Sequence, residues 1–489
     1  MTNPTLYRMM LRTGIVLYPL WLLGCSSIPK YDVPKVETAN TFKEGAAFDA
    51  EQAEAAKLFK PAKGVVQTTP DAWWELFNDP VLNNLQLRAN VGNPNLAVSA
   101  ANVKLAMAAA GTASAALFPT VNVGGGLNRA NVVTAGAPIG TTYSATGSFS
   151  SWELDVWDRL GAAAKSAKLK EVASVATLAS ARLSLQASVA QTYFSLRSAE
   201  ALQAVQAKTI TAYTKSLELT QNRFVGGIAS SADVAQAQSQ LASAKAQAES
   251  SGINRAQLEH ALAALLGESP SGFSLPATAA LPAVPVVALQ VPSNLLERRP
   301  DIAAAERTVA AANASIGAAD AAFFPALTLS ANTGYRSGVL GGLIALPNRI
   351  WSVGPNLTYA LFDGGARKAA SASARATYEQ AVATYKQTVI VALQEVEDNL
   401  VAAAGLAREE GYQQAALDAA RKSLDVTNNQ YKAGVVSYLN VVTAQSTELS
   451  AQSNLLTTQS ARLTALSILL KNLAGRWDAE IKPAQPAAR

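Results

Sequence analysis

The sequence is short of the residues that build reactive centres. Its 489 residues include one cysteine, Cys25, and one histidine, His260. A lone cysteine cannot form an internal disulfide, and without clusters of cysteine and histidine a zinc site or a nucleophilic centre is not expected. His260 lies in an apolar part of a predicted helix and is expected to be a packing residue. We therefore predict that the protein is not an enzyme and holds no metal or soluble cofactor.

The chain also has no large excess of either charge and no long apolar run. Forty Lys and Arg oppose 35 Asp and Glu, and the excess falls from five to three once Arg8 and Arg12 of a predicted signal peptide are removed. Such a mild balance gives no reason to expect a nucleic-acid partner. After Cys25, no apolar run approaches the roughly 20 residues of a membrane-spanning helix. If the mature chain enters a bilayer, it must do so as β-strands.

The N-terminus has the pattern of a lipoprotein export signal. Arg8 and Arg12 precede an apolar stretch from Gly14 to Gly24 that is too short to span a membrane. The stretch ends in Leu22-Leu-Gly-Cys25, which resembles a bacterial lipobox, and no aspartate follows it as an inner-membrane retention signal. We expect a cleaved signal, an N-acyl diacylglyceryl lipid on Cys25 and a location in the outer membrane.

The remainder of the chain is a tandem duplication with an offset of about 206 residues. Gly92-Asn-Pro-Asn-Leu96 matches Arg298-Arg-Pro-Asp-Ile302, and Leu117-Phe-Pro119 matches Phe323-Phe-Pro325. The predicted organisation is a signal peptide at 1–24, an N-terminal tether and equatorial segment at 25–93, a first repeat at 94–269, an equatorial connector at 270–299, a second repeat at 300–474 and a C-terminal tail at 475–489.

Each repeat is predicted to begin with a helix and two strands. Alanine-rich helices from about Asn95 to Leu117 and from about Asp301 to Phe323 end at Phe-Pro, since proline cannot continue the helix. Segments that alternate apolar and polar residues over about ten positions follow, as in transmembrane strands. These segments are Val121–Asn128, Tyr143–Val156, Ala326–Tyr335 and Ile350–Phe362. In the second of them the apolar phase slips between Phe149 and Trp152, which indicates a bulge or the end of the strand.

A long helical hairpin with a glycine turn completes each repeat. Proline is absent between Pro138 and Pro270 and between Pro355 and Pro483, and a continuous helix from Arg159 to Asn222 would extend roughly 95 Å. In the last helix, apolar residues recur every seven positions with small serines between them, which indicates closely packed helices or, alternatively, a plain two-stranded coiled coil.

Four amphipathic strands are too few to close a barrel, because about eight is the smallest transmembrane size. Open strand edges are not tolerated in lipid. Either the strands form an ordinary soluble hairpin or several chains share one barrel, and three chains would supply twelve strands. The sequence alone requires only an oligomer.

Five segments together resemble the outer membrane factors of tripartite efflux pumps (the TolC type), in particular their lipoprotein branch. They are Trp73–Pro80, Ser151–Arg159, Val189–Arg197, Val291–Ile302 and Phe362–Gly365. The resemblance implies an α+β membrane protein: a homotrimeric 12-stranded outer-membrane β-barrel continuous with a periplasmic α-helical barrel and a mixed equatorial domain. It also implies a passive conduit exporting drugs or small solutes, with a periplasmic adaptor (membrane fusion protein) and an inner-membrane pump of the RND type as partners.

Other functions stay open at this point. The same architecture serves as the outer channel of type I protein-secretion or metal-efflux systems. A protein of another class, a non-conducting helical scaffold anchored to outer-membrane lipid, would share the long helices and the lipidated cysteine.

The resemblance places the functional residues at the two hairpin tips, which in the family face the periplasm and meet the adaptor. The expected tip residues are Arg223, Phe224, Gly226, Gly227, Ser230 and Asp233 in the first repeat and Tyr431, Lys432, Gly434, Ser437 and Asn440 in the second. Ser230 to Asp233 has the form of a capping box, and Ser437 to Asn440 occupies the same place. Leu439 and Thr443 are the expected gate. In relatives Thr443 is commonly an aspartate, so this gate is predicted to keep an apolar ring and to lack an acidic one.

Overall fold

The computed structural model describes residues 27–36, 39, 41–58, 72–130, 140–285 and 299–474. Cys25 and the predicted C-terminal tail therefore lie outside the described residues. Short helices open the described chain: α2 (Gly45–Leu58), η1 (Trp73–Phe77) and α3 (Pro80–Gly92). The first repeat follows as α4 (Pro94–Ala115), β1 (Val121–Ala130), β2 (Gly140–Glu153), α5 (Arg159–Val225) and α6 (Ser231–Leu266). The second consists of α8 (Pro300–Ala321), β3 (Ala326–Ser337), β4 (Arg349–Thr358), α9 (Ala366–Lys432) and α10 (Tyr438–Leu473), with short helical turns η2 (Pro270–Gly272), η3 (Leu340–Gly342) and η4 (Leu346–Asn348) in the connections.

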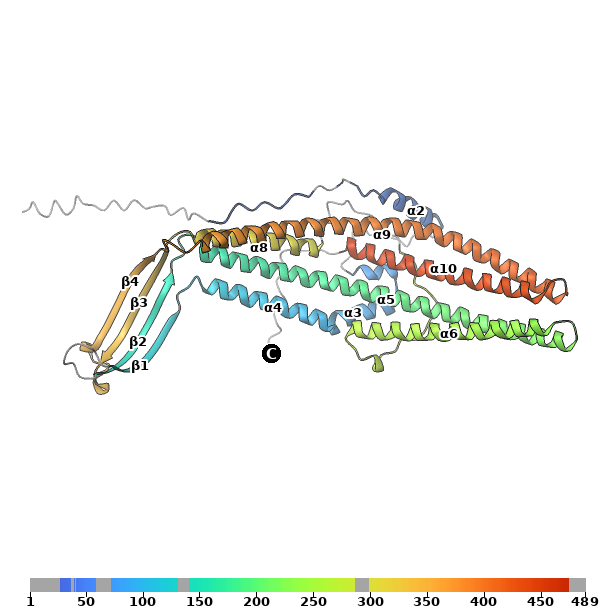
Figure 1. Ribbon diagram of the computed structural model, residues 1–489, viewed down its shortest axis with the longest axis horizontal. Helices are drawn as coiled ribbons and strands as arrows, with labels where there is room; N and C mark the ends of the chain where they lie inside the picture. Colours follow the sequence, from blue (N-terminus) through green and yellow to red (C-terminus); the bar gives the residue numbers. More distant parts are fainter. Residues whose placement is uncertain are drawn as a thin grey trace, which may run out of the picture. The chain divides into compact units, whose positions relative to one another are not determined.

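Corresponding helices of the two repeats have equal lengths, which confirms the duplication. α4 and α8 each have 22 residues, α5 and α9 each have 67, and α6 and α10 each have 36. The ladder from Arg159 runs without interruption past Asn222 to Val225, as the missing prolines predict. Each long helix turns back at a short tip, and Figure 1 shows the resulting hairpins, α5 with α6 and α9 with α10.

The strands form one antiparallel sheet in the order β1-β2-β3-β4 (Figure 1). The predicted irregularity in β2 is confirmed as a register shift between Phe149 and Trp152. The predicted last strand is too long, because β4 ends at Thr358 and the alternating residues through Phe362 belong to the turn into α9. Asp363 shapes that turn by accepting a hydrogen bond from the backbone N–H of Gly365 (2.9 Å).

The register gives the sheet two chemically different faces. Partners across an antiparallel pair share a face, so Val121, Phe149, Ala331 and Val353 lie on one side. Continuing at every second residue, this face is mostly apolar but also carries threonines, Arg129 and Arg349, whereas the other face carries small polar residues such as Ser148. Large apolar side chains on the first face are exposed in a single chain, as expected of a surface that meets lipid.

One described helix is notably apolar. α4 is long and apolar enough to cross a membrane by length and composition alone. The property comes from many alanines rather than from a run of large apolar residues, and Lys104 lies within the helix. Among the described residues, α4 is the only helix with this length and composition.

The chain divides into two compact units. One comprises Lys104–Glu171 and Glu306–Ala383 with the N-terminal segment to Pro34, and it contains the sheet. The other comprises Lys35–Val103, Val172–Ala305 and the chain from Thr384 onward, and it contains the two hairpin tips.

In the sheet-containing unit, the segment that follows Cys25 is fixed along α8. The Ser27 hydroxyl donates to the carbonyl of Gly317 (2.8 Å), and the Tyr31 hydroxyl donates to the carboxylate of Glu306 (2.6 Å). Burial and the hydrogen bond to Glu306 raise the pKa of Tyr31. Gly317 must be glycine, since a Cβ there would lie 2.7 Å from the Cα of Ile28. The first described residues are thus held along α8 by specific contacts.

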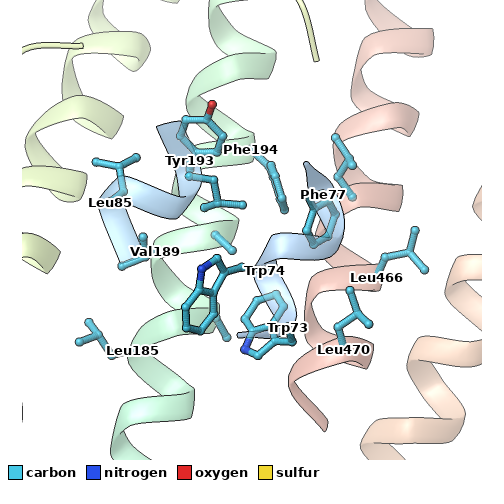
Figure 2. Close-up of a cluster of buried hydrophobic side chains, with 14 of the residues drawn as sticks. Trp73, Trp74, Phe77, Leu85, Leu185, Val189, Tyr193, Phe194, Leu466 and Leu470 are labelled. Carbon is cyan, nitrogen blue, oxygen red and sulfur yellow. The ribbon is translucent and has the colours of Figure 1, made fainter. Parts of the chain in front are cut away.

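The second unit has an aromatic core around η1. Trp73, Trp74 and Phe77 of η1 pack against side chains from α3, α5 and α10 (Figure 2). The Phe77 and Phe194 rings lie 4.8 Å apart. The Tyr193 hydroxyl donates to the Asp79 carboxylate (2.5 Å), and burial together with this bond raises the pKa of Tyr193. The Trp-Trp motif is therefore a structural anchor for the N-terminal segment.

A buried ion network holds the start of the connector between repeats. The side chains of Arg197 and Glu200 are 3% and 2% exposed and join at 2.6 Å, and Arg255 bridges Glu200 and Glu259. The two glutamates also accept hydrogen bonds from backbone N–H groups of the connector, at residues 275 and 278. Each buried charge is thereby paired, as burial requires.

We predict that Arg197→Met destabilises the protein strongly. The substitution leaves Glu200 buried with one cation fewer, which costs about 3–5 kcal/mol. Arg88→Met is the matched control, since Arg88 also pairs with a glutamate, Glu268, but at side-chain exposures of 38% and 37%. It should cost about 0–1 kcal/mol. The midpoint of helix loss on heating, followed by circular dichroism, should fall for Arg197→Met alone; equal shifts would contradict the network's role.

Candidate functional site at the helix tips

The first tip ends α5 with a left-handed glycine. The N–H of Ile228 donates to the carbonyl of Arg223 (2.8 Å), and Gly227 has φ +71°. This is the hydrogen-bond pattern of a Schellman motif, in which glycine avoids the Cβ penalty of positive φ. Gly226, also a predicted tip residue, does not have a positive φ. A Cβ built at Gly226 would lie 3.6 Å from the nearest non-neighbouring backbone oxygen, which is ordinary van der Waals contact. The turn requires Gly227 alone.

The second tip repeats this geometry. The N–H of Val435 donates to the carbonyl of Gln430 (2.9 Å), and Gly434 has φ +78°. Ala433 stands where the first tip has Gly226, which agrees with the tolerance of that position. The two tips therefore share one turn type, as the duplicated sequence predicts.

The starts of the returning helices differ. Ser230 and Asp233 form the predicted capping box, with the Asp233 carboxylate accepting from the backbone N–H and the hydroxyl of Ser230 (2.9 and 2.8 Å). Ser437 is the N-cap of α10, in the same place as Ser230 in α6, but it makes no side-chain cap bond. Its hydroxyl is 3.4 Å from the amide oxygen of Asn440, a neutral group that lacks the charge of a carboxylate.

Arg223 joins the two tips. Its Nη1 donates to the carbonyl of Tyr431 (2.8 Å) and more weakly to that of Lys432 (3.4 Å), the last residues of α9. The Gly434 N–H of the turn also donates to the Tyr431 carbonyl (3.0 Å), and this end of α9 is the negative end of its dipole, which favours a cation there. The guanidinium also lies 4.6 Å from the centre of the Tyr431 ring, and the Tyr431 hydroxyl is 3.2 Å from that of Thr220. We call this set, Thr220, Arg223 and Tyr431, the tip latch.

A small apolar cluster supports the tip latch. The rings of Tyr431 and Tyr438 lie 5.5 Å apart and pack with Ala237, Val441 and Val442. Burial raises the pKa of Tyr438, so its phenol stays neutral. Further along the hairpins, hydrogen bonds run between Gln445 and Ser216 (3.2 Å) and between Gln240 and Ser446 (3.0 Å).

The outer surface of the tips is apolar and exposed. Phe224, Val225, Ile228 and Val435 all keep large exposed fractions, from 47% to 87%. Exposed apolar residues gathered in one place mark interaction sites.

The predicted gate residues lie on α10 just beyond its start. Leu439 is 61% exposed, and Thr443, one turn further along, is also exposed. The Thr443 hydroxyl donates to the carbonyl of Leu439 (3.0 Å), so its only proton is used within the helix. These two positions on α10 therefore expose a leucine side chain and a threonine methyl group, and neither carries a carboxylate.

A groove of about 600 Å³ lies between α5, α9 and α10 above the tips. Its polar lining is basic on balance. The charged residues are Lys208, Lys215, Arg421, Lys432, Asp425 and Glu448.

Thr220 escaped the sequence reasoning, although its partner Tyr431 was predicted. Thr220 and Tyr431 are 211 residues apart, and no local pattern connects them.

The prediction for His260 was wrong, because its side chain is exposed on α6 instead of packed. Within the described part of the chain, no group of three or more His, Cys, Asp or Glu side chains could hold a metal ion.

A membrane-type sheet, proline-free helical hairpins and paired tips define an outer-membrane channel protein. The chain belongs to the outer membrane efflux protein family, whose sequence profile matches it twice, at residues 86–268 and 291–476. It is thus an outer-membrane component of an efflux pump and not an enzyme.

Individual relatives cover almost the whole chain. The toluene efflux pump outer membrane protein TtgC of Pseudomonas putida is 31% identical, with 93% of each chain covered, and the outer membrane protein OprJ of Pseudomonas aeruginosa is 30% identical, with 95% of each covered. Among solved structures, the open state of the MtrE outer membrane channel of Neisseria gonorrhoeae matches with a TM-score of 0.80 at 28% identity, covering 92% of this chain and 98% of that one. The outer membrane protein VceC of Vibrio cholerae matches with a TM-score of 0.77 at 29% identity, covering 84% and 100%.

We predict that Arg223→Met loosens the second tip. A hydrogen bond from a charged donor contributes about 1.5–3 kcal/mol, so its loss should speed local amide exchange about tenfold or more. Hydrogen exchange of a peptide covering residues 428–437, followed by mass spectrometry, measures this. Arg421→Met is the matched control, since Arg421 forms only an exposed pair with Glu448 at 3.6 Å. Equal protection in both variants would show that the tip latch does not hold the tips together.

Proposed function

We propose that three copies of this chain close one twelve-stranded barrel and form a passive exit duct for drugs or small solutes. The observation that carries the proposal is the four-stranded sheet with one apolar face and two edges, β1 and β4, that have no partner strand within the described chain. A sheet in lipid must be closed, and three such sheets reach a size known for transmembrane barrels. The likeness to a toluene efflux pump protein supports small apolar solutes among the cargo.

The periplasmic entrance is proposed to be gated at the tips. The tip latch holds the two hairpins of one chain together, and a ring of Leu439 side chains narrows the opening. An adaptor that contacts the exposed apolar tip residues and the basic groove would displace the tip latch, a switch between two packed arrangements. An RND-type inner-membrane pump would supply the energy, since a passive duct has no catalytic groups of its own.

The N-terminal lipid is proposed to sit on Cys25. Ser27 lies two residues later and is hydrogen-bonded to the carbonyls of Gly317 and Trp157, close to the start of α5. A lipid at Cys25 would therefore enter the membrane near the sheet. The chain from Ser27 to Tyr31 already holds the segment in place, so the lipid adds a second attachment.

A non-conducting scaffold is the competing function, and channel recordings separate the two. Purified trimers in planar bilayers should show small, infrequent openings, and Leu439→Ala should raise single-channel conductance and admit vancomycin into cells, because the apolar ring is removed. Tyr412→Ala, at an exposed residue of α9 outside the proposed gate and adaptor contacts, is the control. No channels from either protein would support the scaffold, and an unchanged Leu439→Ala would refute the gate.

Contact with an adaptor can be tested with one introduced thiol, because Cys25 is the only native cysteine and is expected to carry lipid. Val435→Cys at the second tip should crosslink in native membranes to a membrane fusion protein that mass spectrometry identifies. Tyr412→Cys is the control: it is 75% exposed on the same hairpin, about 30 Å up the helix. Equal crosslinking from both positions, or none from Val435→Cys in actively exporting cells, would contradict the contact.

A further inference from the structure

Two arginines stand on the apolar face of the sheet. Register places Arg129 opposite Thr141 on β2 and Arg349 opposite Tyr335 on β3, both in phase with the apolar residues such as Val123. They are the only charged residues on this face of the four described strands. A charged group facing lipid is costly unless it lies at the membrane border, so their position along the strands matters.

Both arginines lie at the end of the sheet farthest along the strands from the helices. Arg129 is the penultimate residue of β1, and Arg349 is the first residue of β4. On the same face near this end are the aromatic side chains of Tyr143, Tyr335 and Trp351. Aromatic girdles mark the border between hydrocarbon and headgroups, so the guanidinium groups reach the headgroups of the outer leaflet.

The two arginines meet only between copies. β1 and β4 are the two edges of the sheet, so in the proposed trimer, on which this inference rests, β4 of one copy pairs with β1 of the next. Within one sheet the register sets Arg349 level with Gly125, four residues before Arg129. Strands of a closed barrel are tilted and staggered, and a stagger of four residues per copy toward the far end of β1 would set Arg129 of the neighbouring copy level with Arg349.

Like charges on adjacent strands repel, and an anion between them removes the repulsion. We propose that each of the three seams binds a phosphate group of lipid A, the anionic glycolipid of the outer leaflet, between Arg349 of one copy and Arg129 of the next. Arginine suits this role because its planar donors bind phosphate oxygens in pairs, while its methylene stem rests on the apolar surface. The ligand joins two subunits and so stabilises the trimer.

The chain supplies a matched control in Arg336. Arg336 lies at the same end of the sheet, opposite Ser144, but on the polar face. Its side chain therefore faces the interior of the proposed barrel. Removing its charge changes the net charge of the trimer as much as either of the other substitutions does, without touching the lipid-facing surface.

Native mass spectrometry of the purified full-length trimer, titrated with bisphosphorylated lipid A, tests the proposal. The parent protein should retain up to three lipid A molecules, and Arg129→Gln with Arg349→Gln should weaken retention about tenfold or more. Arg336→Gln should bind as the parent does. Lipid A without phosphate should bind weakly to every protein, and phosphatidylglycerol should bind less tightly than bisphosphorylated lipid A.

Unchanged lipid A binding by the double variant would overturn the site, as would an equal loss in Arg336→Gln. Equal binding of phosphatidylglycerol would overturn the assignment to lipid A. The same preparations are recorded in planar bilayers, and their masses report the number of copies. Trimers that conduct but show no arginine-dependent binding would refute this inference alone, whereas absence of trimers would refute the proposed function as well.

Discussion

β1 and β4 each leave one row of backbone N–H and C=O groups without a partner strand in the described chain. In water such edges hydrogen-bond to solvent, but hydrocarbon offers no substitute, and each unsatisfied group there costs several kcal/mol. An apolar face on the same sheet makes the protein enter lipid, while the open edges forbid it from doing so alone. The need for further copies of the chain follows from this constraint.

Duplication supplies two hairpins with the same helix lengths and the same glycine turn, yet the tips are not equivalent. The first is closed by its own capping box at Ser230 and Asp233, whereas the second lacks such a cap and receives Arg223 from the first at the carbonyl end of α9. The first tip therefore has capping bonds of its own, whereas the end of the second carries a contact from its neighbour.

Predictions succeeded where the relevant physics is local in the chain. The absence of proline predicts both long helices, and the predicted span from Arg159 to Asn222 ends only three residues short of α5, which ends at Val225. The slip of apolar phase predicts the irregularity between Phe149 and Trp152. They failed where environment outweighs pattern: β4 ends at Thr358 although apolar residues alternate further, because Asp363 and Gly365 build a turn there. His260 is exposed although its neighbours in sequence are apolar, because the helix turns it away from the core.

By itself the sequence determined the duplication, the order of helices and strands, the apolar and polar faces of the sheet and the family, since each follows from spacing along the chain. Only the tertiary structure decided that Thr220 and Arg223 reach Tyr431 across 211 and 208 residues, and which strands are neighbours in the sheet. Periodicity describes a single element, whereas contacts between distant residues depend on register and helix packing, which no local pattern encodes.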